Sequence, residues 1–262
     1  MRFRKMHGLG NDFVILDQKD ISGTLTADQI RHICDRHFGV GCDLLTVLEP
    51  SDKADIFARF YNADGSESGA CGNATRCVAD LVMNELQVTR CKIQLAYGVL
   101  ECCRADNGMI TVDMGPPLSV EDIDLPDIRL PTSNLQPPTS VNMGNPHCVF
   151  FVSNIEDIDV ETVGHAVENH AAFPDKTNVE FVEIISGTKL RQVTWERGCG
   201  ITLACGSGAC ATAVAASYRN LMDGHKVEIE LDGGTLFIEI HEDGHILMTG
   251  PVAYVFDGML KP

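Results

Sequence analysis

The stretches "ACGNATRC" at 70–77 and "ACGSGACA" at 204–211 each place a cysteine and a glycine just before an apolar segment. Those segments, "CVADLVMN" at 77–84 and "CATAVAASYRNLM" at 210–222, predict helices that are apolar on nearly every side. A helix of this kind has to be buried all round. Two of them in one chain indicate one central helix in each of two domains.

The two cysteines, Cys71 and Cys205, are 134 residues apart, and the same offset relates other parts of the chain. "GLGNDFVIL" at 8–16 corresponds to "NMGNPHCVFF" at 142–151, and both lead from a Gly-Asn turn into an apolar run. "KIQLAYGVLEC" at 92–102 corresponds to "KVEIELDGGTLFIEI" at 226–240, and both predict a strand, a turn and a strand. A period this long indicates a duplicated domain, because solenoid repeats are much shorter.

The predicted fold is therefore α+β, with two pseudo-symmetric duplicated domains. Each is expected to wrap a mostly antiparallel or mixed sheet around its apolar helix, with an amphipathic helix earlier in each copy, at 27–37 and 161–171. We expect the N-terminal half to comprise 1–116, completed by 251–262, and the C-terminal half to comprise 117–250. The Pro-rich, acidic stretch 116–138 reads as the linker.

Composition excludes several classes of protein. The net charge of −17 repels nucleic acid and anionic lipid surfaces, so neither is an expected partner. No run approaches the roughly 18 apolar residues that a membrane-spanning helix needs, and the N-terminal residues lack a secretory leader. The 11 cysteines are an odd number, which favours reduced thiols in a cytoplasmic protein. No CxxC spacing occurs, so no metal site is expected.

The position of each cysteine at a helix start suggests its chemistry. Backbone N–H groups and the helix dipole at such a position favour a thiolate, and the same N–H groups can hold a carboxylate. If Cys71 and Cys205 approach one α-carbon from opposite sides, one thiolate removes a proton while the other thiol delivers one to the opposite face. That reaction is racemisation or epimerisation. No lysine lies in a recognisable pyridoxal-phosphate context, so no cofactor is expected.

Motifs in a fixed order across essentially the whole chain resemble those of the diaminopimelate epimerase family. They are "KMHGLGNDFV", "YNADGSE…CGN", "MGNPHCV", "WERG" and "ACGSGA". Members of that family interconvert LL- and meso-diaminopimelate, a step in making lysine and peptidoglycan precursors, without a cofactor. The resemblance also implies a small amino-acid substrate and a homodimer.

The resemblance further implies a set of site residues. Cys71 and Cys205 would be the two acid/base thiols, with His147 and Glu196 as supporting polar groups beside them. The reacting carboxylate would be held by Gly72, Asn73, Gly206 and Ser207. The remaining substrate contacts would come from Asn11, Asn62, Asn145, Asn178, Glu196 and Arg197, with Arg197 and the amides at the distal amino-acid end. Leu44 stands where the family usually has Gln, which removes one amide from that set.

Other functions remain compatible with parts of the sequence. A racemase of another amino acid, such as histidine, proline, hydroxyproline or glutamate, would use the same chemistry. The pattern G-x-G-x-x-A at 206–211, followed by Glu228, matches a dinucleotide fingerprint and would fit an oxidoreductase. A non-catalytic thiol redox protein would explain the cysteine count, but not the polar residues that recur at one offset.

Overall fold

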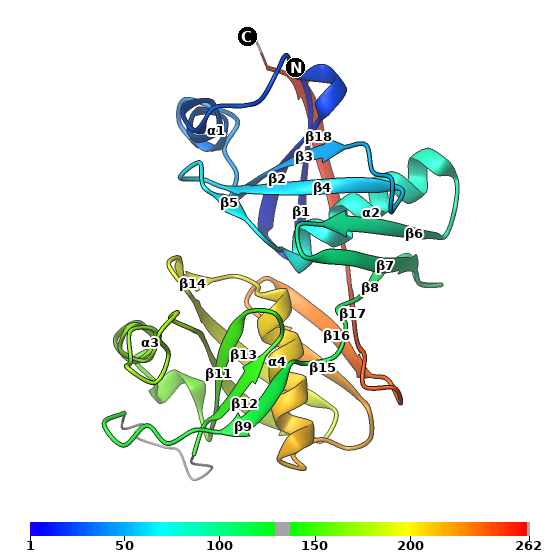
Figure 1. The fold of residues 1–262 in the computed structure, drawn as a ribbon. Coiled ribbons are helices and arrows are strands. Elements are labelled where there is room, and N and C mark those ends of the chain that lie inside the picture. The colour runs from blue at the N-terminus through cyan, green and yellow to red at the C-terminus, as the bar shows by residue number, and fades with distance from the viewer. Residues whose placement is uncertain (129–136, 261–262) are drawn as a thin grey trace. The chain divides into compact units, whose positions relative to one another are not determined.

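The computed structural model describes residues 1–128 and 137–260, so residues 129–136 of the predicted linker and residues 261–262 lie outside the described part. The chain divides into two compact units (Figure 1). Unit 1 consists of Met1–Asp113 and Gly250–Pro262, and unit 2 consists of Met114–Thr249.

Unit 1 is built on a mixed sheet. Its strands are β1 (Arg2–Gly8), β2 (Asn11–Asp17), β3 (Leu44–Glu49), β4 (Ile56–Asn62), β5 (Glu67–Ser68), β6 (Arg90–Leu95), β7 (Gly98–Arg104), β8 (Ile110–Asp113) and β18 (Ala253–Met259). They pair in the order β18-β1-β2-β3-β4-β6-β7-β8, and β5 pairs with β4. The β2–β3 and β4–β6 pairs are parallel, and the other pairs are antiparallel.

Turn and capping residues explain how the first elements of unit 1 form. Gly10, with φ of 83°, lies in the left-handed region and permits the tight turn between β1 and β2. The short helix η1 (Gln18–Asp20) follows β2, and α1 (Ala27–Cys34) then covers the crossover to β3. Thr26 and Gln29 form a capping box at the start of α1.

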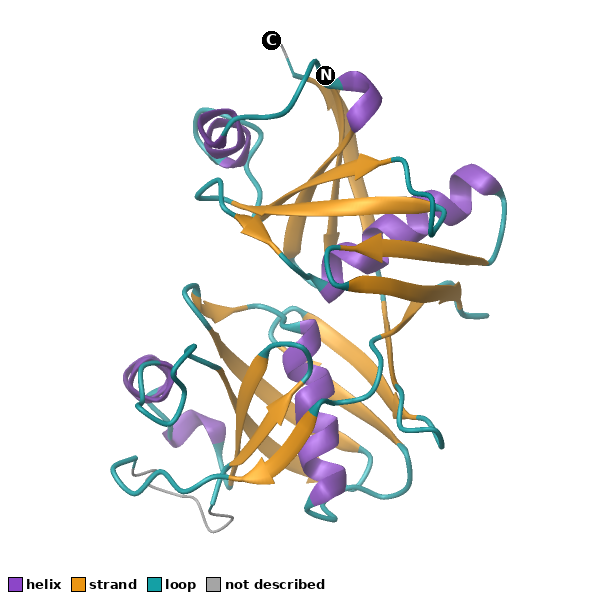
Figure 2. Cartoon of the chain, viewed as in Figure 1, coloured by secondary structure: helices purple, strands orange, loops and turns teal. Residues whose placement is uncertain are grey.

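Helix α2 (Gly72–Leu86) is the central helix of unit 1 and packs against β1, β6, β7 and β8. Figure 2 shows it running across the strands that curve around it. Its apolar side chains, including Val78 and Met83, are buried, whereas Leu86 at its end is 52% exposed. The helix stops at Gln87, which adopts a left-handed conformation with φ of 55°.

Unit 2 repeats the same order of elements. Its strands are β9 (Ser119–Asp122), β10 (Thr139–Asn142), β11 (Pro146–Val152), β12 (Asn178–Ser186), β13 (Lys189–Glu196), β14 (Gly200–Thr202), β15 (Lys226–Leu231), β16 (Gly234–Ile240) and β17 (Ile246–Gly250). They pair in the order β9-β10-β11-β12-β13-β15-β16-β17, and β14 pairs with β13. The β11–β12 and β13–β15 pairs are parallel, at the same places as in unit 1.

The helices of unit 2 also match those of unit 1. Short helix η2 (Ile155–Asp157) precedes α3 (Val160–Glu168), which lies against β12 and β13. The central helix is α4 (Gly206–Tyr218), whose residues from Ala209 to Ala216 are all buried. The strand order and the parallel pairs thus confirm the predicted duplicated α+β fold.

A separate hydrophobic core lies beside the smaller helix in each unit. In unit 1 it joins β2 and β3 to α1 through residues such as Leu16, Ile33 and Val47. In unit 2 it joins β11 and β12 to α3 through residues such as Phe150 and Phe181, whose rings stack 5.6 Å apart. These cores hold β2 and β12, which begin at the predicted site residues Asn11 and Asn178, in fixed positions.

Both central helices begin directly after the two cysteines, as the sequence predicts. Helix α2 begins at Gly72 and α4 begins at Gly206 and ends at Tyr218. The cysteine before each glycine caps the helix and so allows the Gly-Asn and Gly-Ser residues to form its first turn. Within the described residues, no helix has both the length and the hydropathy needed to span a membrane.

Candidate active site

Cys71 and Cys205 are the N-cap residues of the two central helices. Their backbones are extended, with φ of −155° at Cys71 and −114° at Cys205. Each Sγ accepts a hydrogen bond from a backbone N–H in the first turn, from Ala74 at 3.4 Å and from Gly208 at 3.3 Å. Each sulfur therefore lies at the positive end of a helix dipole.

In unit 1, two side-chain amides lie near Cys71, and hydrogen bonds fix the orientation of each amide. Asn11 Oδ1 lies 3.7 Å from Cys71 Sγ and accepts a hydrogen bond from Asn73 Nδ2 at 3.2 Å. Arg76 donates to Asn73 Oδ1 at 2.8 Å, and Asn11 Nδ2 donates to Asp43 Oδ2 at 2.9 Å. Because Arg76 can only donate and the Asp43 carboxylate can only accept, the two charged groups fix which way both amides point.

Asn62 and Tyr97 are two further residues of unit 1, and their interactions with the Cys71 group differ. Asn62 lies at the end of β4, where its Nδ2 donates to Ser66 Oγ at 3.0 Å and closes the turn before β5. This amide therefore bonds within its own turn. Desolvation, with a smaller contribution from Cys71, raises the pKa of Tyr97 to about 12, and Tyr97 is thus a neighbour of the thiol that the sequence did not suggest.

In unit 2, a chain of hydrogen bonds runs from a buried carboxyl group to Cys205. Glu180 Oε1 lies 2.7 Å from His147 Nδ1, and both side chains are fully buried. His147 Nε2 donates to Asn145 Oδ1 at 3.1 Å, and Asn145 Nδ2 donates to Ser207 Oγ at 3.2 Å. Ser207 Oγ then lies 3.7 Å from Cys205 Sγ. His147 thus reaches the thiol through two intermediate side chains rather than by direct contact.

Burial decides the protonation of Cys205. It raises the pKa of the Cys205 thiol well above its usual range, and the charges of Glu196 and Glu180 raise it further. The hydrogen bonds from Gly208 and Ser207 lower it by less. The sequence-based expectation that the helix start alone would favour a thiolate is therefore wrong for Cys205, because desolvation outweighs the dipole.

In unit 2, residues predicted to bind the distal end of the substrate lie together on a turn and at the end of a strand. Arg197 N donates to Asn178 Oδ1 at 3.0 Å, and the Arg197 guanidinium donates to the carbonyl of Asp175 at 2.9 Å. Glu196 Oε1 accepts from Thr202 Oγ1 at 2.6 Å. Asn178 and Arg197 therefore form one polar group, and the charge of Glu196 acts on Cys205.

Gly208 is required by the close approach of two of these side chains. A Cβ at this position would lie 2.7 Å from Glu180 Oε1 and 3.2 Å from Cys205 Sγ. The glycine therefore lets the carboxyl group and the thiol both lie close to the first turn of α4.

Sequence reasoning missed Glu180 and Asp43. Glu180 lies in the otherwise apolar run "NVEFV" at 178–182, and every residue of that run is buried. A lone carboxyl group in a buried strand needs a partner, which was a signal for function. Asp43 had no comparable signal, because its contact with Asn11 joins residues that are 32 positions apart.

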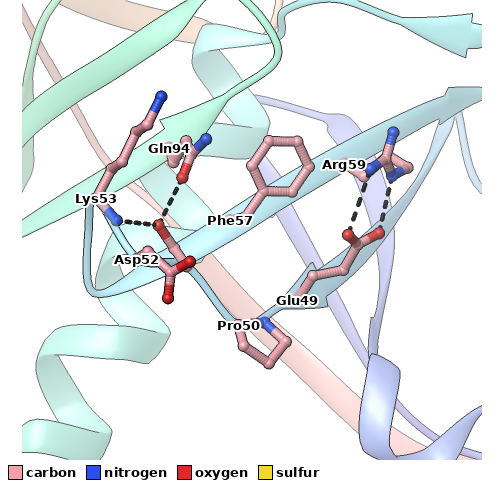
Figure 3. Close-up of a pocket in the computed structure, with 8 residues that line it drawn as sticks. Glu49, Pro50, Asp52, Lys53, Phe57, Arg59 and Gln94 are labelled. Carbon is pink, nitrogen blue, oxygen red and sulfur yellow. Dashed lines mark hydrogen bonds and ion pairs between the residues drawn. The ribbon is translucent and has the colours of Figure 1, made fainter.

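Unit 1 has a pocket that is lined by residues outside the predicted site. It is lined by Glu49, Pro50, Ser51, Asp52, Lys53, Phe57, Arg59 and Gln94 (Figure 3). Arg59 donates to Glu49 Oε1 at 2.8 Å, and Ser51 donates to Gln94 Oε1 at 2.5 Å. None of the predicted site residues lines this pocket, and its main polar side chains bind one another.

Comparison with known proteins shows a match along nearly the whole chain. The model of the family described as "Diaminopimelate epimerase" matches residues 3–120 and 139–255. A diaminopimelate epimerase from Rhodospirillum centenum is 50% identical, with 99% of this chain and 92% of the relative covered. One from Synechococcus elongatus is 40% identical, with 100% of this chain and 98% of the relative covered.

Solved structures show the same fold at much lower sequence identity. A Bacillus anthracis phenazine biosynthesis protein of the PhzF family has a TM-score of 0.78 at 15% identity, with 100% and 99% of the two chains covered. A hydroxyproline epimerase from Agrobacterium vitis has a TM-score of 0.68 at 14% identity, with 98% and 91% covered. At such identities the likeness concerns the fold alone.

Proposed function

The chain belongs to the diaminopimelate epimerase family, and from this premise we propose that it interconverts LL- and meso-diaminopimelate with Cys71 and Cys205 as the acid/base pair. One thiolate takes the α-proton, and the other thiol protonates the opposite face of the same carbon. The observation that carries the proposal is that two thiols cap equivalent helices of a duplicated fold. The functional halves are 1–116 with 251–262, and 117–250.

The other residues then have separate roles. The α-carboxylate is held by the first N–H groups of α2 and α4, at Gly72 and Gly206, together with Asn73 and Ser207. Fixed donors of this kind stabilise the negative charge that develops as the proton leaves, so the proposed reaction uses no cofactor.

The rest of the substrate is bound by further polar residues, with Arg197 and Asn178 at the distal amino-acid end. Contacts to that end are proposed for Arg197, Asn178, Asn11, Asn62, Asn145 and Glu196. His147 supports Asn145 through its Nε2–H. Burial favours the thiol form of Cys205 over the thiolate.

Exchange of the α-proton tests the reaction and the substrate together. The protein is incubated in D₂O with LL-diaminopimelate, and separately with proline, hydroxyproline, histidine and glutamate. We expect deuterium at the α-carbon of diaminopimelate, with formation of the meso isomer. Exchange only in one of the other amino acids would replace the proposed substrate with that one.

Single replacements of the thiols test the mechanism. Cys71→Ser and Cys205→Ser are each expected to lower kcat for epimerisation by at least roughly a thousandfold, because serine is a far weaker acid and base than cysteine. Cys103→Ser, a half-buried thiol on β7, is the control and is expected to retain activity. Epimerisation at the native rate by either active-site variant would rule out the two-thiol mechanism.

We also propose a homodimer that works in the cytoplasm. Strand β18 exposes Tyr254, Val255 and Met259, which are 53%, 51% and 73% exposed, and a second copy of the chain would cover them. Light scattering is expected to give twice the chain mass for the native protein and a lower mass for Val255→Lys. All 11 cysteines are free thiols, which suits a reducing compartment.

A further inference from the structure

One buried carboxylate holds both ends of the turn that carries Arg197. Glu168 is the last residue of α3, and its side chain is 4% exposed. Its Oε2 accepts a hydrogen bond from Trp195 Nε1 at 2.8 Å, and its Oε1 accepts from Gly198 N at 3.1 Å. Trp195 and Gly198 directly flank Glu196 and Arg197, so Glu168 fixes the turn on both sides.

The same carboxylate also fixes the segment on the other side of Arg197. Lys176 Nζ donates to Glu168 Oε1 at 3.1 Å, two residues before Asn178. Asn178 in turn accepts from the backbone N–H of Arg197. We call Glu168, Lys176, Trp195 and Gly198 the Glu168 clasp. Its three donors come from separate places in the chain and meet on one carboxyl group.

The carboxylate is ionised at neutral pH. Burial alone would raise its pKa, but the hydrogen bonds from Trp195, Lys176 and Gly198 outweigh burial and keep the pKa of Glu168 below its usual value. A carboxylate that accepts from three fixed donors is held in one orientation. The donors are therefore held as well.

Unit 1, the other copy of the duplicated fold, lacks this arrangement. At the offset of 134 residues, Glu168 and Lys176 correspond to Cys34 and Cys42 of unit 1. Both thiols are buried, and their Sγ atoms lie 3.5 Å apart. Asn178 corresponds to Leu44. The same framework is thus filled by thiols and an apolar side chain in unit 1 and by an ion pair and an amide in unit 2. Simple core packing does not require the polar version.

We propose that Glu168 is a positioning residue for substrate binding, because the Glu168 clasp holds Arg197 and Asn178 in the geometry that receives the distal charged end of an amino-acid substrate. Glu168 itself does not touch the substrate. The inference rests on the proposed function, since it takes Arg197 and Asn178 as the distal binding residues.

Replacement of one oxygen by nitrogen should disrupt the clasp with little change of volume. In Glu168→Gln, the side-chain oxygen can keep accepting from Gly198 N–H and the Lys176 ammonium, but the new NH₂ group then faces the Trp195 N–H, which is also a donor. The hydrogen bond from Trp195 and the negative charge are lost, so the turn that carries Arg197 is released on the Trp195 side.

The kinetic test separates binding from chemistry. Glu168→Gln is expected to raise KM for diaminopimelate at least roughly tenfold while kcat stays within about threefold, since lost hydrogen bonds to a charged group cost that much and the thiols are untouched. The control is Glu161→Gln, which removes the same charge from an exposed position in the first turn of α3 and should leave both constants unchanged. A kcat loss without a change in KM would overturn the proposal.

The single tryptophan supplies a readout that does not depend on turnover. Trp195 is the only tryptophan in the chain, so its indole N–H gives one signal in a ¹H–¹⁵N spectrum. In the wild type this proton should exchange slowly with solvent. We expect faster exchange in Glu168→Gln and in Lys176→Met, and no change in Glu161→Gln. Lys176→Met should raise KM by a smaller factor, because two donors to the carboxylate remain.

The outcomes separate this inference from the proposed function. A wild type that does not turn over diaminopimelate defeats the proposed function, whatever the indole signal does. An active wild type whose Glu168→Gln variant keeps its KM and its indole exchange rate defeats the inference alone. If Glu168→Gln does not fold, Lys176→Met decides in the same way, because its ammonium is half exposed and its loss leaves no buried gap.

Discussion

The buried pair of His147 and Glu180 gives the sharpest stability prediction. Both side chains are fully buried, and Nδ1 lies 2.7 Å from Oε1. Glu180→Leu leaves the imidazole buried without its carboxyl partner, and His147→Leu leaves the carboxyl group buried without its imidazole. Leaving a buried polar group without its hydrogen-bond partner costs about 1–3 kcal/mol of unfolding free energy. For a unit of this size we expect a fall in Tm of roughly 3–12 °C.

The double replacement should cost less than the sum of the single ones. An apolar pair of similar volume leaves no buried polar group without a partner, so the coupling between the two sites is expected to be at least about 1 kcal/mol. The distance and the complete burial both argue for strong coupling, whereas an exposed pair would show almost none.

Urea unfolding followed by Trp195 fluorescence measures these values. Trp195 lies in unit 2 with the pair, so its signal reports the unit that the replacements affect. The control is Lys226→Leu, because the Lys226 side chain is in unit 2, is 74% exposed beside Glu239 and should change the free energy by about 0.5 kcal/mol or less. Additive effects, or a Glu180→Leu variant within about 1 kcal/mol of the wild type, would refute the reasoning.

Three further predictions concern pH, close packing and substrate affinity. Burial opposes ionisation of Asp12, but hydrogen bonds from Arg36 and Lys5 lower its pKa to about 2. The ionised group contributes roughly 1–2 kcal/mol of stability above its unfolded pKa, and this contribution is lost as pH falls towards 2. Urea unfolding measured between pH 5 and 2 should therefore show a shallower decline of the unfolding free energy for Asp12→Asn than for the wild type. Gly208→Ala should lower kcat at least roughly tenfold, because the new Cβ would lie 2.7 Å from Glu180 Oε1 and displace that carboxyl group. Steady-state assays check this, with Gly98→Ala as the control because its Cβ would meet open space. Leu44→Gln restores the amide that the family usually has and should lower KM for diaminopimelate roughly threefold to tenfold, and an unchanged KM would remove position 44 from the binding set.

The sequence determined the architecture because its signals are local and repeated. The glycine-cysteine turns, the apolar helices and the strand pairs recur at one offset, and each is readable from periodicity and turn residues alone. Asn73 and Ser207 follow the two cysteines in the sequence, whereas Asn11 and Asn145 were assigned to the site only by the family resemblance. In the structure, Asn11 and Ser207 lie 3.7 Å from the sulfur atoms of Cys71 and Cys205, and Asn73 and Asn145 donate to Asn11 and Ser207, respectively.

Only the tertiary structure decided which groups support those residues and how the thiols are protonated. Glu180, Asp43 and Glu168 act through partners that are distant in sequence, and no local pattern identifies those partners. The pKa of Cys205 depends on burial and on the charges of two glutamates, and the helix start that the sequence displays does not outweigh them. Periodicity and turn residues arise from neighbours along the chain, whereas desolvation and hydrogen-bond direction arise from the packing of the folded chain.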